Sequence, residues 1–356
     1  MAGDAVTSAA LAALKVHGGR VDLAALAYPD APRPWIDLST GINPVPYPIP
    51  PLPPECFSRL PLAAELDQLC AAAAAAYGLP RGAVLLPAPG SEIAIRLAPR
   101  VLAAHGVKVG ILTPTYSSHA AAWRAAGAQV HELAALPDAR AGLAALVIVN
   151  PNNPDGRAFD AAALSAFAQR WCAAGKQLVV DEAFADVRPK LSLLHEPALP
   201  RGVVVLRSLG KFFGLAGLRL GFVAVDARDA GPWRDLLGDW AASGPACAIA
   251  TRALRDDSWI TTTGRRLAAD RLRLDATLAT AGLTACGGTD LFGLYEDRDG
   301  RDLVDAFARA GILIRGFSHS PQRYRFGLPV DEAAWRRLAQ ACAMLITAPT
   351  ASEAAV

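Results

Sequence analysis

The sequence lacks the patterns that mark several common classes of protein. Its six cysteines include no Cys-x-x-Cys pair and its six histidines no His-x-x-x-His pair, so neither a disulfide framework nor a metal site is indicated. A formal net charge of +2 argues against a nucleic-acid-binding surface. No apolar run reaches the roughly 18 residues that a membrane-spanning helix needs. These absences favour a large soluble enzyme.

The N-terminus also lacks a basic segment followed by a long apolar core, so we expect no secretion signal and a cytoplasmic location. Alanine raises the hydrophobic content to 53%, as in residues 71–76, which indicates helices and not a membrane. At 356 residues the chain exceeds what one compact core usually holds. Two domains are therefore expected.

Lys211 is the most informative residue. It follows an apolar strand predicted at residues 203–206 and lies in the glycine-rich segment Ser-Leu-Gly-Lys-Phe-Phe-Gly-Leu-Ala-Gly-Leu-Arg at residues 208–219. A lysine in a partly dry loop can lose its proton and attack an aldehyde, as a Schiff-base lysine does with pyridoxal phosphate. Ser208 and Arg219 can both donate to one phosphate. An isolated lysine would more often be a solvated loop residue, but this one has these neighbours.

Two further strands end in polar residues. The apolar run at residues 143–149 leads into the turn Asn-Pro-Asn-Asn-Pro-Asp-Gly, which places Asn153 to donate to a ring oxygen. The run at residues 177–181 ends in Asp181, and a carboxylate there can keep a pyridine nitrogen protonated. Taken singly, the first motif is a common turn and the second a strand-end cap.

An anion site is indicated at the start of a predicted helix. Small residues in Gly90, Ser91 and Glu92 precede the helical pattern of residues 93–104, and a helix N-terminus attracts phosphate. Ser91 alone would more often be a plain N-cap. Tyr116, after the strand predicted at residues 107–113, can stack on a pyridine ring or simply pack.

Five motifs occur in order along the chain: Gly-Ser-Glu at 90–92, Pro-Thr-Tyr at 114–116, Asn-Pro-Asn-Asn-Pro-Asp-Gly at 150–156, Val-Asp-Glu-Ala-Phe at 180–184, and the Lys211 segment. Together they resemble the fold-type I pyridoxal phosphate enzymes of the aspartate aminotransferase superfamily. The likeness covers nearly the whole chain and points to the branch of the histidinol-phosphate aminotransferases and threonine-phosphate decarboxylases.

The resemblance implies a role for each matching residue. Lys211 would carry the cofactor, Asp181 would hold the ring nitrogen, Asn153 the ring oxygen, and Tyr116 would stack on the ring. The implied phosphate ligands are Gly90, Ser91, Ser208 and Arg219, with Glu92 also at the cofactor site. Catalysis would rest on Lys211, Asp181 and Tyr116.

Within this branch, three segments resemble the threonine-phosphate decarboxylases of cobalamin biosynthesis: His-Gly-Gly-Arg at 17–20, Asp-Leu-Ser-Thr-Gly-Ile-Asn-Pro at 37–44 and Tyr-Arg-Phe-Gly-Leu-Pro at 324–329. Phe184 stands where the aminotransferases usually carry a tyrosine, which favours the decarboxylase. Arg325 lies where the superfamily binds the substrate carboxylate. The further candidates for binding substrate are Asn43, Arg157, His17 and Arg20, with Arg323 more remote.

The expected fold class is α/β, with a large domain built on a mainly parallel sheet wrapped by helices and a smaller α+β domain. We expect the large domain at residues 43–230 and the small one at 231–356, joined by an N-terminal segment at 1–42. The resemblance implies a homodimer. Two other functions stay open: an aminotransferase of the histidinol-phosphate type, and a non-catalytic regulator, which the intact Lys211, Asp181, Asn153 and Arg219 disfavour.

Overall fold

The computed structural model describes residues 18–102 and 105–347. The chain forms two compact units. The larger comprises residues Pro46–Thr262, and the smaller combines Met1–Val45 with Thr263–Val356. No helix in the described ranges is long and apolar enough to cross a membrane.

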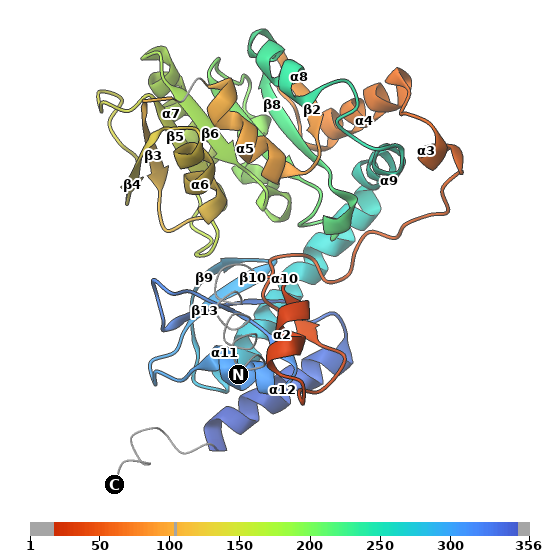
Figure 1. The fold of residues 1–356 in the computed structure, drawn as a ribbon, viewed down its shortest axis with the longest axis vertical. Helices are drawn as coiled ribbons and strands as arrows, with labels where there is room; N and C mark the ends of the chain where they lie inside the picture. Colours follow the sequence, from red (N-terminus) through yellow and green to blue (C-terminus); the bar gives the residue numbers. More distant parts are fainter. Residues whose placement is uncertain (1–17, 103–104, 348–356) are drawn as a thin grey trace, which may run out of the picture. The chain divides into compact units, whose positions relative to one another are not determined.

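The larger unit is built on a seven-stranded sheet with the order β2-β8-β7-β6-β5-β3-β4 (Figure 1). Five strands from β7 to β4 run parallel, and β8 is antiparallel to both β7 and β2. The strands are β2 (Ala83–Ala88), β3 (Lys108–Leu112), β4 (Gln129–Leu133), β5 (Ala145–Val149), β6 (Gln177–Asp181), β7 (Val203–Ser208) and β8 (Gly221–Asp226). The predicted α/β class, with its mainly parallel sheet, is confirmed.

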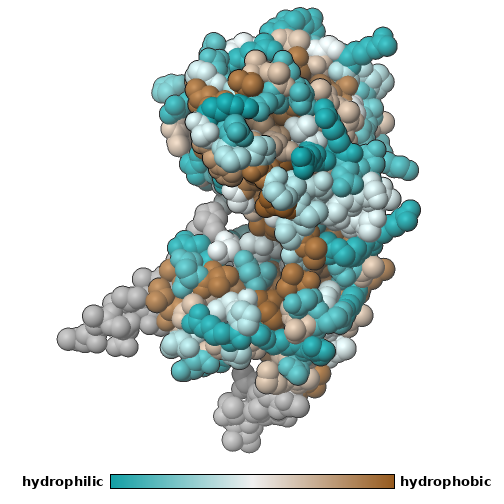
Figure 2. Space-filling model, turned by 90° about the vertical axis from the view of Figure 1, so that its right-hand side faces the viewer, coloured by the Kyte–Doolittle hydropathy of each residue, from teal (hydrophilic) through white to brown (hydrophobic). Residues whose placement is uncertain are grey.

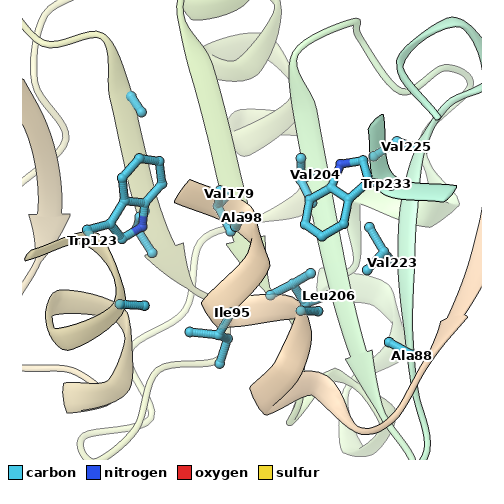
Figure 3. Close-up of a cluster of buried hydrophobic side chains, with 14 of the residues drawn as sticks. Ala88, Ile95, Ala98, Trp123, Val179, Val204, Leu206, Val223, Val225 and Trp233 are labelled. Carbon is cyan, nitrogen blue, oxygen red and sulfur yellow. The ribbon is translucent and has the colours of Figure 1, made fainter. Parts of the chain in front are cut away.

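Helices cover both faces of this sheet because its central strands are continuous apolar runs whose successive side chains point to opposite faces. The helices are α3 (Glu55–Ser58), α4 (Ala63–Ala76), α5 (Ser91–Val101), α6 (Ser117–Ala125), α7 (Ala161–Ala173), α8 (Gly231–Leu237) and α9 (Gly244–Leu254). In Figure 3, Ile95 and Ala98 of α5 lie over Val179, Val204 and Leu206 of the sheet. Trp123 and Trp233 close the same core on either side. This packing holds the N-terminus of α5 beside the carboxyl ends of the strands.

The smaller unit carries a four-stranded antiparallel sheet in the order β12-β13-β10-β9. A two-stranded parallel sheet pairs β1, from the N-terminal segment, with β11. Its elements are α2 (Val21–Ala27), β1 (Ile36–Asp37), β9 (Thr284–Thr289), β10 (Phe292–Glu296), α11 (Leu303–Arg309), β11 (Ile312–Leu313), β12 (Arg315–Gly316), β13 (Arg323–Gly327) and α12 (Glu332–Thr347).

The division between the units differs from the expected one. It lies at residues 262 and 263, inside helix α10 (Asp257–Ala279), and not at 230 and 231. Helix α8 contacts β2 and α5, while α9 packs along α4. Residues 231–262 therefore bury their apolar faces within the larger unit, a long-range packing choice that their local helical pattern does not reveal.

Candidate cofactor and active site

A cavity of about 290 Å³ opens at the carboxyl ends of the parallel strands in the larger unit. Strands that run in the same direction bring their carboxyl ends to one edge of the sheet, where ligands of such sheets bind. All nine residues that the sequence assigned to the cofactor line this cavity: Gly90, Ser91, Glu92, Tyr116, Asn153, Asp181, Ser208, Lys211 and Arg219. Motifs as much as 129 positions apart in the chain are thus brought to one place.

Asp181 is a buried acid at the end of β6, and its side chain is held from two sides. Its Oδ2 lies 2.9 Å from Nε2 of His119, and its Oδ1 accepts from the backbone N–H of Ala183 at 3.0 Å. His119 is itself 1% exposed. The sequence analysis missed this histidine, although its place three positions after Tyr116, on the same face of α6, was an available signal. The carboxylate is therefore fixed in direction.

Tyr116 lies at the start of α6, and its hydroxyl donates to Glu92 Oε2 at 3.2 Å. Arg96 donates from Nε to the other oxygen of Glu92 at 2.9 Å. Burial raises the pKa of Tyr116, and the negative charge of Glu92 raises it further. The phenol therefore stays protonated and keeps donating to Glu92, which holds its ring at the cavity wall.

Another part of the cavity lining is suited to an anion. Gly90, with φ of 87°, precedes the first residue of α5, whose initial N–H groups have no acceptor within the helix. A Cβ on Gly90 would lie 2.6 Å from Nη2 of Arg219. Ser208 ends β7 close by, and its Oγ accepts from Gly210 N–H at 3.3 Å. A helix N-terminus, a guanidinium and a hydroxyl thus form one cradle.

Arg219 itself has an unusual backbone. It is the one residue other than glycine with a positive φ, 54°, in the described part of the chain. Its Nη1 donates to the carbonyl of Ala216 at 3.1 Å. Left-handed backbone is costly for a residue with a Cβ and is found where a functional geometry requires it.

Lys211 and Asn153 complete the lining. The Lys211 ammonium lies 5.5 Å from the centre of the Phe184 ring. The turn that carries Asn153 is held by its neighbour Asn152, which accepts from the Thr115 hydroxyl at 2.6 Å and donates to the Asp155 carboxylate at 2.7 Å. The cavity therefore combines an amine, a carboxylate and an anion cradle, which is the equipment for binding a phosphorylated aldehyde.

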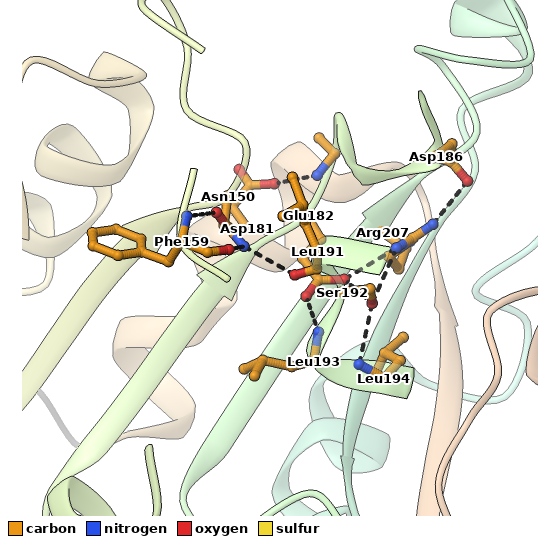
Figure 4. Close-up of polar contacts among 11 residues, drawn as sticks. Asn150, Phe159, Asp181, Glu182, Asp186, Leu191, Ser192, Leu193, Leu194 and Arg207 are labelled. Atoms are coloured by element: carbon orange, nitrogen blue, oxygen red, sulfur yellow. Dashed lines mark hydrogen bonds and ion pairs between the residues drawn. The ribbon is translucent and has the colours of Figure 1, made fainter. Parts of the chain in front are cut away.

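A buried ion cluster lies beside the cavity and was not anticipated from the sequence (Figure 4). Arg207 donates to Glu182 Oε2 at 3.0 Å and to Asp186 Oδ1 at 2.8 Å. Burial raises the pKa of both carboxyl groups, and the guanidinium partly offsets this. Glu182 also accepts from the Ser192 hydroxyl at 2.5 Å and from Leu193 N–H at 2.8 Å.

The substrate-binding candidates in the described part of the chain are not among the residues that line this cavity. Arg157 lies in the Asn153 turn, but its guanidinium donates to the carbonyl of Ala134 at 3.4 Å. Arg325 belongs to the smaller unit, where it is buried and donates to the Ser39 carbonyl at 2.6 Å. Asn43, also in that unit, accepts from Arg266 at 2.6 Å.

Three other basic candidates are less informative. Arg20 is exposed and pairs with Asp22 at 3.6 Å, and Arg323 lies 3.8 Å from Glu296. His17 lies outside the described residues.

Comparison with known proteins places these features in a family. The family model described as aminotransferase class I and II matches residues 60–352. A threonine-phosphate decarboxylase of Sinorhizobium sp is 42% identical over 330 residues, covering 93% of this chain and 98% of that protein. The Pseudomonas aeruginosa threonine-phosphate decarboxylase is 43% identical, with coverage of 90% and 95%. A histidinol-phosphate aminotransferase of Geobacter sulfurreducens is 31% identical, with coverage of 66% and 68%.

Solved structures agree on the fold. Histidinol-phosphate aminotransferase from Clostridium acetobutylicum matches with a TM-score of 0.75 at 18% identity, covering 88% of this chain and all of that one. The Sinorhizobium meliloti histidinol-phosphate aminotransferase, solved in complex with pyridoxal-5'-phosphate, matches with a TM-score of 0.70 at 22% identity, covering 82% and 83%.

Proposed function

Because the chain belongs to the class I and II aminotransferase family, we propose that it decarboxylates L-threonine O-3-phosphate with pyridoxal phosphate as cofactor. The products are (R)-1-amino-2-propanol phosphate and carbon dioxide. The observation that carries this proposal is the match to two threonine-phosphate decarboxylases over nearly their whole length. The family resemblance predicted from the five motifs is confirmed.

The cavity fits the cofactor. Its volume of about 290 Å³ is near the lower end of the range for small-molecule pockets, roughly 300–1,000 Å³. The cradle of Gly90, Ser208 and Arg219 suits a phosphate dianion. A side chain at Gly90 would close this cradle, because its Cβ would meet the Arg219 guanidinium.

The proposed roles follow from where each group lies. The Lys211 amine would hold the aldehyde carbon, Asp181 would keep a proton on the pyridine nitrogen, and Asn153 would donate to the ring oxygen. His119 holds Asp181 in direction through the contact at 2.9 Å. Tyr116 flanks the ring face. When bound, pyridoxal phosphate supplies an electron sink for the pair left at the substrate Cα as carbon dioxide departs.

Orientation of the substrate decides which bond breaks, because only a Cα bond perpendicular to the pyridine plane passes its electrons into the ring. A decarboxylase aims the carboxylate in that direction, and an aminotransferase aims the Cα hydrogen. After carbon dioxide leaves, Lys211 Nζ or a water would return a proton to Cα. The predicted ligands of the substrate's anionic groups remain Arg325, Asn43, Arg157, His17 and Arg20.

The proposed context is cobalamin biosynthesis in the cytoplasm, with a homodimer as the working assembly. An apolar surface supports the dimer. Helix α3 packs on α9, yet Phe57, Leu60 and Leu62 in and after α3 are 70%, 58% and 53% exposed. The face that carries α3 is the one seen in Figure 2, where apolar side chains lie among polar ones. Exposed apolar patches commonly mark protein interfaces.

Product analysis tests the proposed activity. The protein loaded with pyridoxal phosphate is incubated with L-threonine O-3-phosphate and no keto acid, and carbon dioxide and amino-propanol phosphate are quantified. Equal amounts of both are expected. Absence of both, together with amino transfer from histidinol phosphate to 2-oxoglutarate, would replace the proposal with the aminotransferase function.

A further inference from the structure

A second, much smaller cavity of about 50 Å³ lies in the larger unit beside the ion cluster. Its polar lining includes Tyr77, Asp186 and Arg207, and its apolar lining includes Phe212, Phe213 and Ile260. Neither the sequence analysis nor the proposed mechanism assigns this cavity a role.

Three buried polar atoms belong to the lining residues and have no hydrogen-bond partner among the described residues: the Tyr77 hydroxyl, Asp186 Oδ2 and Arg207 Nε. Tyr77 is 3% exposed, and the side chains of Arg207 and Asp186 are 3% and 8% exposed. Buried polar groups without partners are costly, and native proteins satisfy nearly all of them. Because the three residues all line this one cavity, a single partner placed there would satisfy all three atoms.

Water fits this cavity by both size and chemistry. A buried water needs about 10–15 Å³ of such volume and two to four polar partners. The three atoms offer a donor in Arg207 Nε, an acceptor in Asp186 Oδ2, and a hydroxyl that does either.

We propose that ordered water fills this cavity, bridges Tyr77, Asp186 and Arg207, and makes Arg207 a positioning residue for the cofactor site. The Arg207 guanidinium already lies 4.1 Å from the centre of the Tyr77 ring and donates to Glu182 and Asp186. A water that accepts from Arg207 Nε would satisfy the last unpaired N–H edge of the guanidinium and would restrict rotation of this planar group.

The functional part of this inference rests on the proposed cofactor role of Asp181 and Ser208. Glu182 directly follows Asp181, the last residue of β6, and continues its pairing with β7 through a bond from its N–H to the Leu206 carbonyl at 2.9 Å, while Arg207 directly precedes Ser208 on β7. Successive side chains of a strand point to opposite faces. The ion pair therefore ties the two strand ends together on one face, while Asp181 and Ser208 reach the cavity of the cofactor on the other.

The substitution Tyr77→Phe tests whether the Tyr77 hydroxyl is hydrogen-bonded to water or has no partner. If water bridges the hydroxyl, the full-length variant unfolds about 2–4 °C below the wild type, which corresponds to one lost hydrogen bond. An unchanged or higher midpoint would overturn the water site, because removal of an unsatisfied buried hydroxyl does not destabilise. Tyr47→Phe is the matched control, since the Tyr47 hydroxyl donates to Asp256 at 3.2 Å.

A crystal structure of the full chain checks the occupant directly. A water peak within hydrogen-bond distance of Arg207 Nε and Asp186 Oδ2 is expected. A dry cavity, or an ion in place of water, would overturn the proposal.

Cofactor affinity tests the positioning role. At a temperature where all variants are folded, Tyr77→Phe raises the dissociation constant for pyridoxal phosphate about fivefold or more, whereas Tyr47→Phe does not. Equal affinity in both variants would overturn positioning. Failure of the wild type to bind pyridoxal phosphate would contradict the proposed function instead, and the unfolding midpoints would still decide the water site.

Discussion

Asp181 and Glu182 are adjacent acids that meet two different environments. Asp181 lines the large cavity and contacts the His119 ring, whereas Glu182 is buried in an ion cluster with Arg207, Ser192 and Leu193 N–H. The pleat of the strand sends one side chain to each face. Of these two adjacent residues, Asp181 faces the proposed cofactor site and Glu182 belongs to the buried ion cluster.

The difference shows how the site is kept rigid. Groups in the cavity must be available to a ligand, so the surrounding structure has to hold them. The cluster is suited to this because it lies next to the site and its side chains, at most 8% exposed, are bound to one another. Substitutions on the two sides should thus differ in their main effect: loss of turnover at unchanged stability in the cavity, and loss of stability, accompanied by weaker cofactor binding, in the cluster.

The largest functional effect is expected from Lys211→Ala. It removes the amine that we propose as the anchor of the cofactor, so turnover should fall by about 10²–10⁴-fold or more. Borohydride reduction followed by mass spectrometry should find no cofactor attached. The exposed Lys190, changed to Ala, is the control and should leave both readouts unchanged. An active variant that still carries attached cofactor would contradict the role of Lys211.

The substitution Arg207→Met disrupts the buried ion cluster. Two buried carboxyl groups lose their cation, so the free energy of unfolding should fall by about 3–5 kcal/mol, measured by urea denaturation. Arg228→Met is the control, because the Arg228 side chain is 68% exposed although it pairs with Asp226. Its midpoint should stay close to that of the wild type. If both substitutions lowered the free energy of unfolding equally, the buried cluster would contribute no more to stability than the exposed pair.

A smaller functional effect is expected from His119→Asn. Loss of the contact to Asp181 lets the carboxylate turn away from the ring nitrogen. A hydrogen bond to a charged group contributes about 1.5–3 kcal/mol, so kcat should fall roughly 10- to 150-fold while KM changes little. His131→Asn, at an exposed position, is the comparison. A normal kcat would show that Asp181 needs no such support.

The smallest effect is expected at the phosphate cradle. Gly90→Ala adds a Cβ 2.6 Å from Arg219 Nη2, whereas Gly82→Ala adds one with nothing within 4 Å. Both glycines have a similar positive φ, 87° and 80°, so both variants should lose about 1–2 kcal/mol of stability. Only Gly90→Ala should weaken pyridoxal phosphate binding, about tenfold. Binding is measured by fluorescence titration. Equal affinity of the two variants for pyridoxal phosphate would show that the cofactor phosphate binds away from Gly90.

Much of the larger unit could be predicted because its strands are continuous apolar runs that end in polar motifs. Residues 177–181 were predicted as a strand and form β6 with those bounds. The cavity lining followed from the same logic, since parallel strands share one carboxyl edge. Local patterns sufficed wherever the function of a residue depends on its place at a strand end.

Contacts between residues far apart in the chain could not be predicted from the sequence in this way. His119 and Asp181 are 62 positions apart, and Arg207 finds carboxylates 25 and 21 positions away. Nothing in the run that ends β7 indicates that Arg207 is buried and paired. The division at residues 262 and 263 was missed for a similar reason, because α8 and α9 are packed by the larger unit and not by their own pattern.

One paired measurement tests the central contrast most directly: kcat and the free energy of unfolding, determined for Asp181→Asn and Glu182→Gln. Both changes replace a carboxylate by an amide of nearly the same shape. Asp181→Asn should lose most turnover and keep its stability, whereas Glu182→Gln should lose stability and, while folded and saturated with cofactor, keep most of its turnover. If both variants lost turnover equally at unchanged stability, the division between chemistry and scaffold at the end of β6 would be wrong.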